Sequence, residues 1–383
     1  MIIQIDETNT LNKGAELMFF AIIEELEKRQ LSSKVIFNSS TPHLPKNRSN
    51  LNLVERRKQL GYLYSSIIAP GLNKFNLPNA FFTTKFKVDN VDVVIDAGGF
   101  QFSDQWKPTQ NYLNLINNYY GKLKRQNPKS KLIFLPQALG PFETKNGKKI
   151  VEILDKYADL IIAREQISFD YIEKHLVNKS KLKCFPDFTL KVLGEIPEKY
   201  KHLKDKVCII PNRKMVTHTN ASIDQYVNFY KVIINELKNR NKDVFLLNHE
   251  GKGDLKICNT IRQKIDPNIE IVTNINAKEV KGVISQSALV ISSRFHGVAS
   301  SLSSAVPCLS TSWSHKYKML FQDFGQTDMI FNLDSDEEQI KEKIEFVFKN
   351  KEKIQDTLKT KKEELLVKIE SMWDLVENTI KNN

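Results

Sequence analysis

The sequence predicts an α/β protein of two doubly wound, Rossmann-like domains, each with a parallel sheet covered by helices. The chain has 383 residues, which is more than a single hydrophobic core usually organises. Short runs of β-branched residues alternate with helical patterns from one end to the other. Such runs are apolar throughout, as in LIIA at 160–163 and VCII at 207–210, which is typical of strands buried on both faces of a parallel sheet.

Ten runs are predicted as strands, five in each half of the chain. They are 2–5, 91–96, 131–135, 160–163 and 183–185 in the first half, and 207–210, 244–247, 269–272, 289–292 and 308–310 in the second. Helical patterns lie between them, the clearest at 15–29, 109–126, 222–239 and 277–286. Helices of this length between buried strands predict right-handed βαβ crossovers.

The domain boundary is predicted in the segment KVLGEIPEKYKHLKDK at 191–206, which is charged and has no hydrophobic period. The domains are therefore predicted at 1–192 and 193–383. Two doubly wound domains with a ligand cleft between them form the GT-B architecture. The charged helical tail at 336–380 is a candidate to cross back onto the first domain.

Charge and cysteine content restrict the class of protein. The formal net charge is +12, but the lysines are spread along the chain and no basic block with interleaved aromatics occurs, so a nucleic-acid partner is not expected. Solvated helix faces explain most of this charge, and a loose affinity for anionic membrane surfaces is the second interpretation. The cysteines are widely spaced and form no CxxC pair, which predicts buried thiols, no structural zinc and a reducing cytosol. Because MIIQIDETNT is predicted as a strand and not as a signal peptide, we expect a cytoplasmic protein.

Candidate ligand-binding residues follow the first two strands, because ligands of open parallel sheets gather at the carboxyl ends of strands. Asn12 and Gly14 stand where a helix begins, with an ordinary cap and turn as the alternative. Asp96 ends the strand at 91–96, and Gly98 and Gly99 follow it. A glycine pair there exposes backbone N–H groups and leaves room for a substrate, although many simple turns also contain one.

Two further candidates follow the next strands of the first half. Gln137 lies in LPQALGP at 135–141, where Gly140-Pro141 fixes a turn. Arg164 ends the strand at 160–163. It either faces the same ligand site or pairs with Glu165 or Asp187 for a structural purpose.

The strongest candidate site follows the strand at 289–292. Ser293, Arg294 and His296 precede a small-residue helix predicted to begin at about Gly297, and Lys316 follows one βα unit later. A helix N-terminus with Arg and His beside it suits an anion, because free N–H groups and the helix dipole favour negative charge there. Arginine offers a paired hydrogen-bonding edge to a carboxylate or phosphate, and histidine donates a proton near neutral pH.

The segment ISSRFHGVASSLSSAVPCLSTSWSHK at 291–316 resembles the signature of the polysaccharide pyruvyl transferase family, in which a strand ends in S-x-R-x-H-G and a Lys follows downstream. The N-x-G, the glycine pair and the P-Q-x-x-G-P run occur in the family's order, and the stretches around Arg164 and Asp187 are similar as well. The resemblance spans about residues 9–325. The chain departs from many members at Ala15, where they have Asp, and at Ala97, where they have a third glycine.

The resemblance implies transfer of the pyruvyl group of phosphoenolpyruvate to two hydroxyls of one sugar, forming a ketal and releasing phosphate. It implies a donor side at 193–383 and an acceptor side at 1–192. No cofactor or metal is implied, and the acceptor is a saccharide or a lipid-linked oligosaccharide, with peripheral association at the inner face of the membrane as a further expectation. His296 is the candidate acid for the methylene carbon of the donor.

The other roles are assigned by chemistry. Arg294, with Arg164 and Lys316, is expected to hold the anion and stabilise the departing phosphate. Candidates for the general base are Asp96, Asp187 and Glu250. A GT-B glycosyltransferase that uses a nucleotide sugar is the nearest alternative, because fold alone does not decide between them. A non-catalytic polysaccharide-binding protein is the second alternative.

Overall fold

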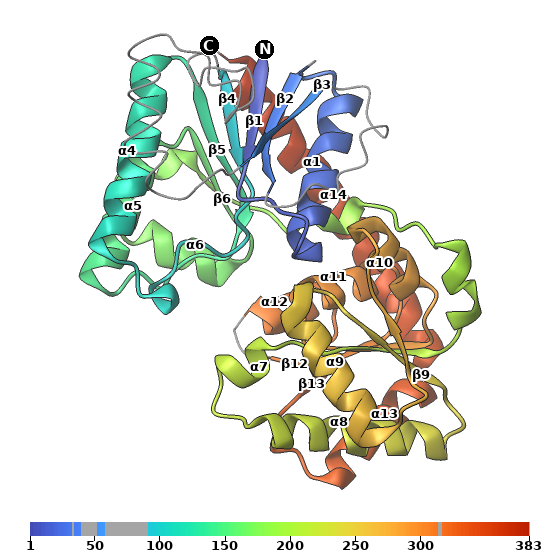
Figure 1. Cartoon of the computed structure of the whole chain (residues 1–383). Coiled ribbons are helices and arrows are strands. Elements are labelled where there is room, and N and C mark those ends of the chain that lie inside the picture. Colours follow the sequence, from blue (N-terminus) through green and yellow to red (C-terminus); the bar gives the residue numbers. More distant parts are fainter. Residues whose placement is uncertain (33, 40–51, 58–90, 313–315, 383) are drawn as a thin grey trace. The chain divides into compact units, whose positions relative to one another are not determined.

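A computed structural model describes residues 1–32, 34–39, 52–57, 91–312 and 316–382 (Figure 1). The chain divides into two compact units. The N-terminal unit comprises Met1–Thr10, Met18–Phe188 and Lys368–Asn383, and the C-terminal unit comprises Leu11–Leu17 and Thr189–Val367. Two short stretches therefore belong to the unit formed mainly by the other half of the sequence.

The N-terminal unit contains a seven-stranded parallel sheet of order β3-β2-β1-β4-β5-β6-β7. Its strands are β1 (Ile2–Asp6), β2 (Lys34–Ser39), β3 (Asn52–Arg57), β4 (Val93–Asp96), β5 (Lys131–Gln137), β6 (Leu160–Ala163) and β7 (Leu182–Cys184). This is the Rossmann order, in which strands are added on one side from β1 to β3 and on the other side from β4 to β7. The switch point therefore lies between β1 and β4. The register places Asp6 opposite Asp96 at the carboxyl ends of these two strands.

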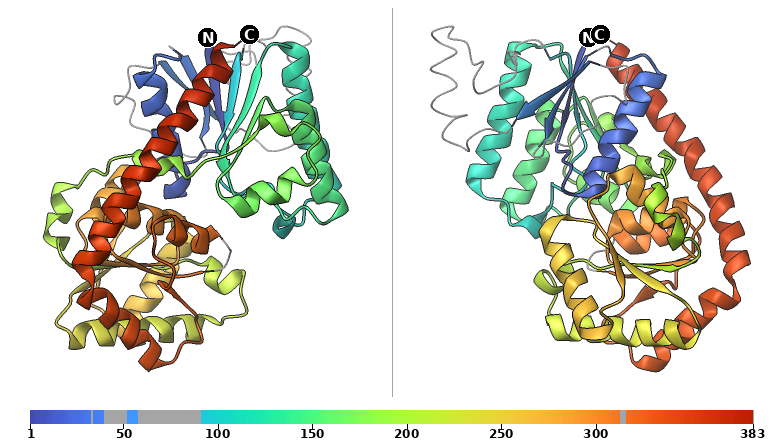
Figure 2. Two further views of the ribbon diagram at one scale, coloured as in Figure 1. Left: turned by 180° about the vertical axis from the view of Figure 1, so that it is seen from behind. Right: turned by 45° about the vertical axis from the view of Figure 1, so that its right-hand side comes forward.

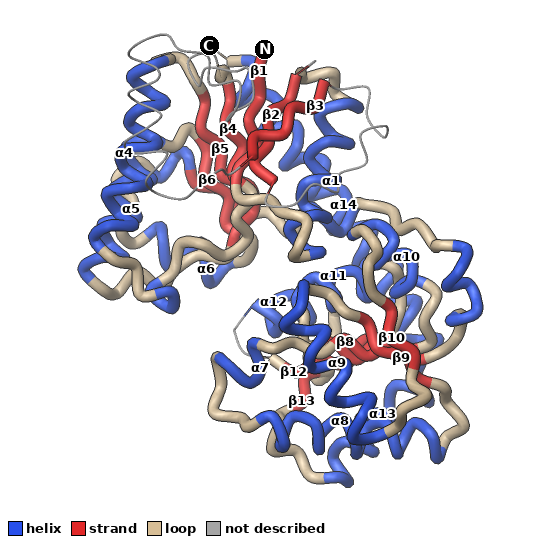
Figure 3. Tube along the Cα trace, in the orientation of Figure 1, coloured by secondary structure: helices blue, strands red, loops and turns tan. Residues whose placement is uncertain are grey.

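Amphipathic helices cover both faces of this sheet, as Figure 3 shows. They are α1 (Lys13–Lys28), α4 (Gln110–Gln126), α5 (Lys145–Tyr157) and α6 (Gln166–Glu173), with 3-10 turns at Asp104–Trp106, Lys179–Lys181 and Phe188–Lys191. Thr109 begins α4 by accepting a hydrogen bond from the Tyr112 N–H, the usual role of an N-cap hydroxyl. Leu113 and Leu154 then pack with the strand residue Phe134 in one hydrophobic core.

The C-terminal residues of the chain pack onto α1 in this unit (Figure 2). Arg29 lies at their centre, with its guanidinium against Glu25, Asp374 and Glu377. Nearby, the ring of Trp373 meets Phe188 edge to face with centroids 5.9 Å apart. A fully buried tryptophan and a shared arginine therefore hold residues 368–382 in place.

The C-terminal unit contains a six-stranded parallel sheet of order β10-β9-β8-β11-β12-β13. Its strands are β8 (Val207–Ile210), β9 (Val244–Leu247), β10 (Glu270–Val272), β11 (Leu289–Ser292), β12 (Cys308–Thr311) and β13 (Ile330–Phe331). Its helices are α7 (Lys214–Thr217), α8 (Ile223–Asn239), α9 (Gly251–Ile265), α10 (Ala277–Ser285), α11 (Phe295–Ser303), α12 (Lys316–Asp323), α13 (Glu337–Lys349) and the first part of α14 (Lys351–Lys381), with a 3-10 turn at Glu198–Leu203. The order is again that of a Rossmann sheet, now with its switch point between β8 and β11.

The predicted α/β class with parallel sheets is confirmed, and every predicted strand is present. The expectation of five strands in each half was wrong, because β2, β3 and β13 were missed. The tail at 336–380 is helical as predicted and consists of two helices, α13, which ends at Lys349, and α14, which begins at Lys351. Cys184 is exposed, against the expectation of buried thiols, because it ends the edge strand β7. Among the described residues, no helix has the length and apolar character needed to cross a bilayer.

Candidate functional site

The turn from β11 into α11 is held by Ser292. Its hydroxyl donates to the Arg294 carbonyl and accepts from the Arg294 N–H, at 2.9 and 3.0 Å. Gly297 packs so closely that an added Cβ would lie 2.4 Å from the Ser292 Oγ, so a glycine is required there. The helix begins at Phe295 and not at about Gly297 as expected, because Arg294 already has extended backbone and serves as the N-cap.

Arg294 is buried and held by two carboxylates. Its Nε and Nη2 donate to the two oxygens of Asp254 at 2.7 and 2.6 Å, and its Nη1 contacts Glu250. Burial raises the pKa of Asp254, and the charge of Arg294 opposes that shift. The paired edge of the guanidinium, which the sequence analysis assigned to a ligand, therefore faces Asp254. Only the Nη1 side, toward the half-buried Glu250, is left to contact a ligand.

Ser293 lies at the centre of a fully buried hydroxyl network. Its Oγ is within hydrogen-bonding distance of Tyr226, Tyr230 and Thr311, at 2.7, 3.0 and 2.6 Å. The Tyr226 hydroxyl also accepts from the Asn212 N–H, which ties the end of β8 to the end of β11. The hydroxyl of Ser293 is thus enclosed by protein, and we assign this residue to support of the turn and not to substrate contact.

His296 lies half-buried in the first turn of α11 against the N-x-G segment. A Cβ on Gly14 would lie 2.1 Å from its Nδ1, so the imidazole rests directly on the glycine backbone. Asn12 accepts from the Gly14 N–H at 2.9 Å and pairs with Glu250 through a backbone bridge. The structure thus brings the first and fourth predicted segments together within the C-terminal unit.

This contact gives a first prediction. Gly14→Ala is expected to displace the His296 ring and, if His296 is the acid that the family resemblance implies, to lower turnover by roughly a hundredfold, the usual cost of a ~1 Å misplacement of a catalytic group. The fold should survive, because alanine favours helix more than glycine and the clashing atoms belong to a movable side chain. Steady-state kinetics and a melting curve check this, with Leu11→Ala as the control in the same segment. Unchanged turnover in Gly14→Ala would show that His296 needs no fixed position.

Two cationic residues at this switch point escaped the sequence analysis. Arg213 and Lys214 directly follow β8, in the segment PNRK after the strand VCII. The Arg213 N–H donates to Asp254 at 3.0 Å. Burial lowers the pKa of Lys214, and the nearby Glu250 opposes this effect. The sequence does contain a signal for these two residues. They follow an apolar strand, and that is the pattern that located the other four segments.

Further positive charge surrounds the start of α11. Lys316 is almost buried and lies 5.4 Å from the ring centroid of Phe295. Positions 313–315 of the signature segment lie outside the described residues. The imidazole of His249 is buried, and burial together with the charges of Arg294 and His296 holds its pKa well below the usual range. His249 is therefore neutral at neutral pH.

The N-terminal unit brings its own predicted residues together around Asp96. One oxygen of this carboxylate accepts from the Gly98 N–H, from Gln101 and from Gln137, at 3.0, 2.6 and 2.8 Å. The side-chain Oε1 of Gln137 is buried and has no hydrogen-bond partner in the described part of the chain. On the neighbouring strand, Asp6 accepts from the Tyr119 hydroxyl at 2.5 Å.

Asp96 is nearly inaccessible to solvent, so its charge is strongly disfavoured. Burial, with the negative charges of Glu7 and Asp6, raises the pKa of Asp96 to about 8. Like charges on adjacent strand ends disfavour double ionisation. This carboxyl group is therefore largely protonated at neutral pH, and its conjugate base accepts a proton more readily than an ordinary aspartate.

The remaining predicted residues of this unit have structural partners. Arg164 is buried, with its guanidinium 3.5 Å from Glu165 and 3.4 Å from Asp187. These ion pairs correspond to the structural alternative that was predicted for Arg164. They also engage Asp187, one of the candidate general bases. Gly99 has a φ of +64°, a backbone conformation that glycine adopts without strain, and packs against Met18.

Comparison with solved structures shows the fold class. Similar chains include Anabaena HepE in complex with UDP and glucose (TM-score 0.61, 12% identity, 100% of this chain and 99% of that chain). A putative UDP-N-acetylglucosamine 2-epimerase from Listeria monocytogenes matches with TM-score 0.56 and 12% identity, over 93% and 89% of the two chains. A trehalose-6-phosphate synthase matches with TM-score 0.58 and 8% identity, over 100% and 99%.

Two Rossmann sheets with polar residues at both switch points, and these similarities, define a GT-B-type fold shared with enzymes. At such identities the likeness concerns the fold alone. The sequence is more specific: the model of the polysaccharide pyruvyl transferase family matches residues 12–315. The chain belongs to this family, as the S-x-R-x-H-G segment suggested.

Proposed function

We propose that this protein transfers the pyruvyl group of phosphoenolpyruvate to a sugar of a cell-surface polysaccharide or of its lipid-linked precursor, with formation of a ketal. The observation that carries the proposal is the cationic switch point of the C-terminal unit. There, His296 and Arg294 begin α11 beside Lys214 and Lys316. Phosphoenolpyruvate carries a carboxylate and a phosphate, so its binding needs cations and N–H donors together.

The donor is expected at the N-terminus of α11. The first turn of a helix has unpaired N–H groups and a favourable dipole for an anion. Lys214 and Lys316 supply further positive charge, and the Nη1 of Arg294 is the edge that a donor oxygen reaches by replacing Glu250. The remaining edge stays fixed on Asp254, so Arg294 both positions the turn and contacts the ligand.

His296 then protonates the methylene carbon of the donor, which leaves a cationic centre at the carbon that bears phosphate. One sugar hydroxyl adds to this centre, phosphate departs, and the second hydroxyl closes the ketal. The two hydroxyl protons balance the reaction: the base takes one of them, which makes up through solvent for the proton given by His296, and the other leaves with phosphate. No oxidant, reductant or metal is needed for this balance.

Asp96 is the base we assign to the acceptor hydroxyl. Its pKa of about 8 makes its ionised form basic enough for that step. The other two candidates are less suitable, because Asp187 is paired with Arg164 and Glu250 contacts Arg294. Since lipid-linked precursors are membrane-bound, the proposal includes a cytoplasmic enzyme that works at the inner face of the membrane.

Donor choice is tested by thermal stability. Phosphoenolpyruvate is expected to raise the melting temperature, because a ligand at a hundredfold excess over its Kd stabilises the native state by about 2.7 kcal/mol. UDP-glucose and UDP-N-acetylglucosamine should leave it unchanged. Stabilisation by a nucleotide sugar and not by phosphoenolpyruvate would favour the glycosyltransferase alternative.

A further inference from the structure

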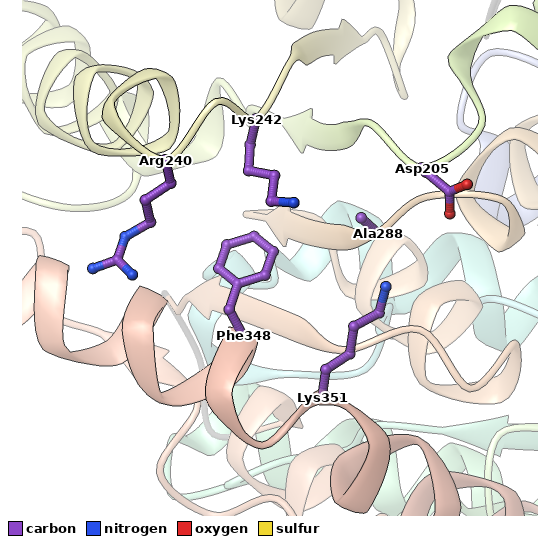
Figure 4. A pocket seen from close by; sticks show the side chains of 6 residues that line it. All are labelled: Asp205, Arg240, Lys242, Ala288, Phe348 and Lys351. Carbon is purple, nitrogen blue, oxygen red and sulfur yellow. The ribbon is translucent and has the colours of Figure 1, made fainter.

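A hollow of about 540 Å³ lies in the C-terminal unit, far from the residues assigned to the donor. It is lined by Asp205, Arg240, Lys242, Ala288, Phe348 and Lys351 (Figure 4). Lys242 and Ala288 stand just before β9 and β11, at the amino ends of these strands. Because every strand of this sheet is parallel, the hollow is on the opposite edge from Lys214 and Arg294, which follow strands. We call it the amino-edge hollow.

The cations of this hollow differ in how they are engaged. Arg240 is paired with Glu236 and Glu345, at 2.5 and 3.3 Å. Lys242 and Lys351 are half-buried and have no carboxylate partner among the described residues. Figure 4 shows both ammonium groups directed into the hollow, on either side of Ala288. Two ammonium groups that converge with no described carboxylate in ion-pair contact, and with Asp205 as the one carboxylate of the described lining, favour an anion at this place.

The rest of the lining adds an apolar surface and an acceptor. The Lys242 Nζ lies over the Phe348 ring, 5.5 Å from its centroid. Asp205 stands at the other end of the hollow, with its carboxylate exposed (Figure 4). A cavity of this size is in the range of small-molecule sites, which combine an apolar wall with a few converging polar groups. Lysine binds phosphate as a point charge, without the fixed geometry of arginine.

We propose that the amino-edge hollow binds a sugar phosphate, with the phosphate on Lys242 and Lys351 and the sugar ring on Phe348. Asp205 is placed to accept a hydrogen bond from a sugar hydroxyl. The ligand is either a free sugar phosphate or the phosphate-linked sugar head of a lipid. This site is separate from the proposed donor site, and the inference does not depend on pyruvyl transfer.

Calorimetry with glucose 1-phosphate, and with glucose as the uncharged control, tests the free ligand. The wild-type protein should bind glucose 1-phosphate and not glucose. The double variant Lys242→Gln/Lys351→Gln should bind about tenfold or more weakly, a loss of about 1.4 kcal/mol or more, because both charges that face the phosphate are removed. The control Lys122→Gln/Lys129→Gln removes the same charge from exposed positions of the N-terminal unit and should bind as the wild type does. Phe348→Leu should weaken glucose 1-phosphate and leave the binding of inorganic phosphate unchanged.

Vesicles test the lipid source. Phosphatidylcholine vesicles containing phosphatidylinositol carry a phosphate-linked ring, whereas those containing phosphatidylglycerol carry the charge alone. Binding that prefers the first, and that the double variant loses, assigns the hollow to a lipid head group. Binding to glucose 1-phosphate that the double variant loses assigns the hollow to a free ligand.

Affinities that are equal in the double variant and the control, or no binding to either probe, would overturn the proposal. Turnover is not measured, so failure here leaves the pyruvyl transfer proposal untouched.

Discussion

His296→Gln is expected to lower turnover by roughly a hundredfold or more, the usual contribution of a positioned proton donor, while phosphoenolpyruvate still binds. Glutamine keeps a hydrogen-bond donor near the position of the imidazole nitrogen but delivers no proton. The start of α11 should be preserved, because it is set by Ser292, Gly297 and the Arg294–Asp254 pair. His296→Ala should behave similarly in turnover and bind the donor somewhat more weakly.

The measurement is kcat together with the donor Kd, taken from calorimetry in the absence of acceptor. His175→Gln is the matched control, because His175 is an exposed histidine of the N-terminal unit. If His296→Gln turned over nearly as fast as the wild type, His296 would be an anion ligand and not the acid. A loss of donor binding with unchanged kcat would lead to the same conclusion.

Most of the strands that the sequence predicted lie in the interior of a sheet, where burial on both faces produces a local apolar run. The edge strands β7 and β10 were predicted as well, and the interior strand β2 was missed. The missed strand β3 lies at the edge of its sheet and has the sequence NLVERR. Edge strands often carry charge, which protects them against pairing with other chains. The missed strand β13 is an edge of two residues, Ile330–Phe331, too short to give a periodic signal.

The site was predicted in part for a similar reason. The rule that ligands gather at strand ends is local, and it located Asp96 and Gln137, which the structure joins by a hydrogen bond. It equally applies to Arg213 and Lys214. Partners on distant elements follow no local rule. Asp254 is separated from Arg294 by 40 residues, and its role as the carboxylate that fixes this arginine depends on the packing of α9 against the turn.

Asp96→Asn is expected to change activity and stability in opposite directions. If Asp96 is the base, its amide should lower turnover by about a hundredfold or more, because an amide accepts no proton. The hydrogen bonds from Gly98, Gln101 and Gln137 converge on one oxygen, which the amide retains. Loss of activity should therefore occur without loss of the local structure.

The stability effect follows from the pKa of about 8 for the buried Asp96, against an ordinary value near 3.8. The native state binds this proton more tightly than the unfolded chain does. The contribution of Asp96 to the free energy of unfolding is therefore fully present below about pH 3.8 and is lost as the pH rises through about 8. Asparagine never ionises, so the variant should melt with the wild type only below about pH 3.8, and increasingly above the wild type as the pH rises to about 8. Asp170→Asn, at an exposed position, should show no such divergence.

A second variant separates catalysis from stability. Asp6→Asn removes one of the negative charges that raise the pKa of Asp96, so Asp96 should ionise at a lower pH. The wild-type kcat/KM is expected to rise with pH as Asp96, the proposed base, ionises, for as long as His296, the proposed acid, keeps its proton. In Asp6→Asn this rise should shift to lower pH while the maximal rate stays similar. A pH profile that Asp6→Asn leaves in place, together with normal turnover in Asp96→Asn, would remove Asp96 from the reaction and turn attention to Glu250.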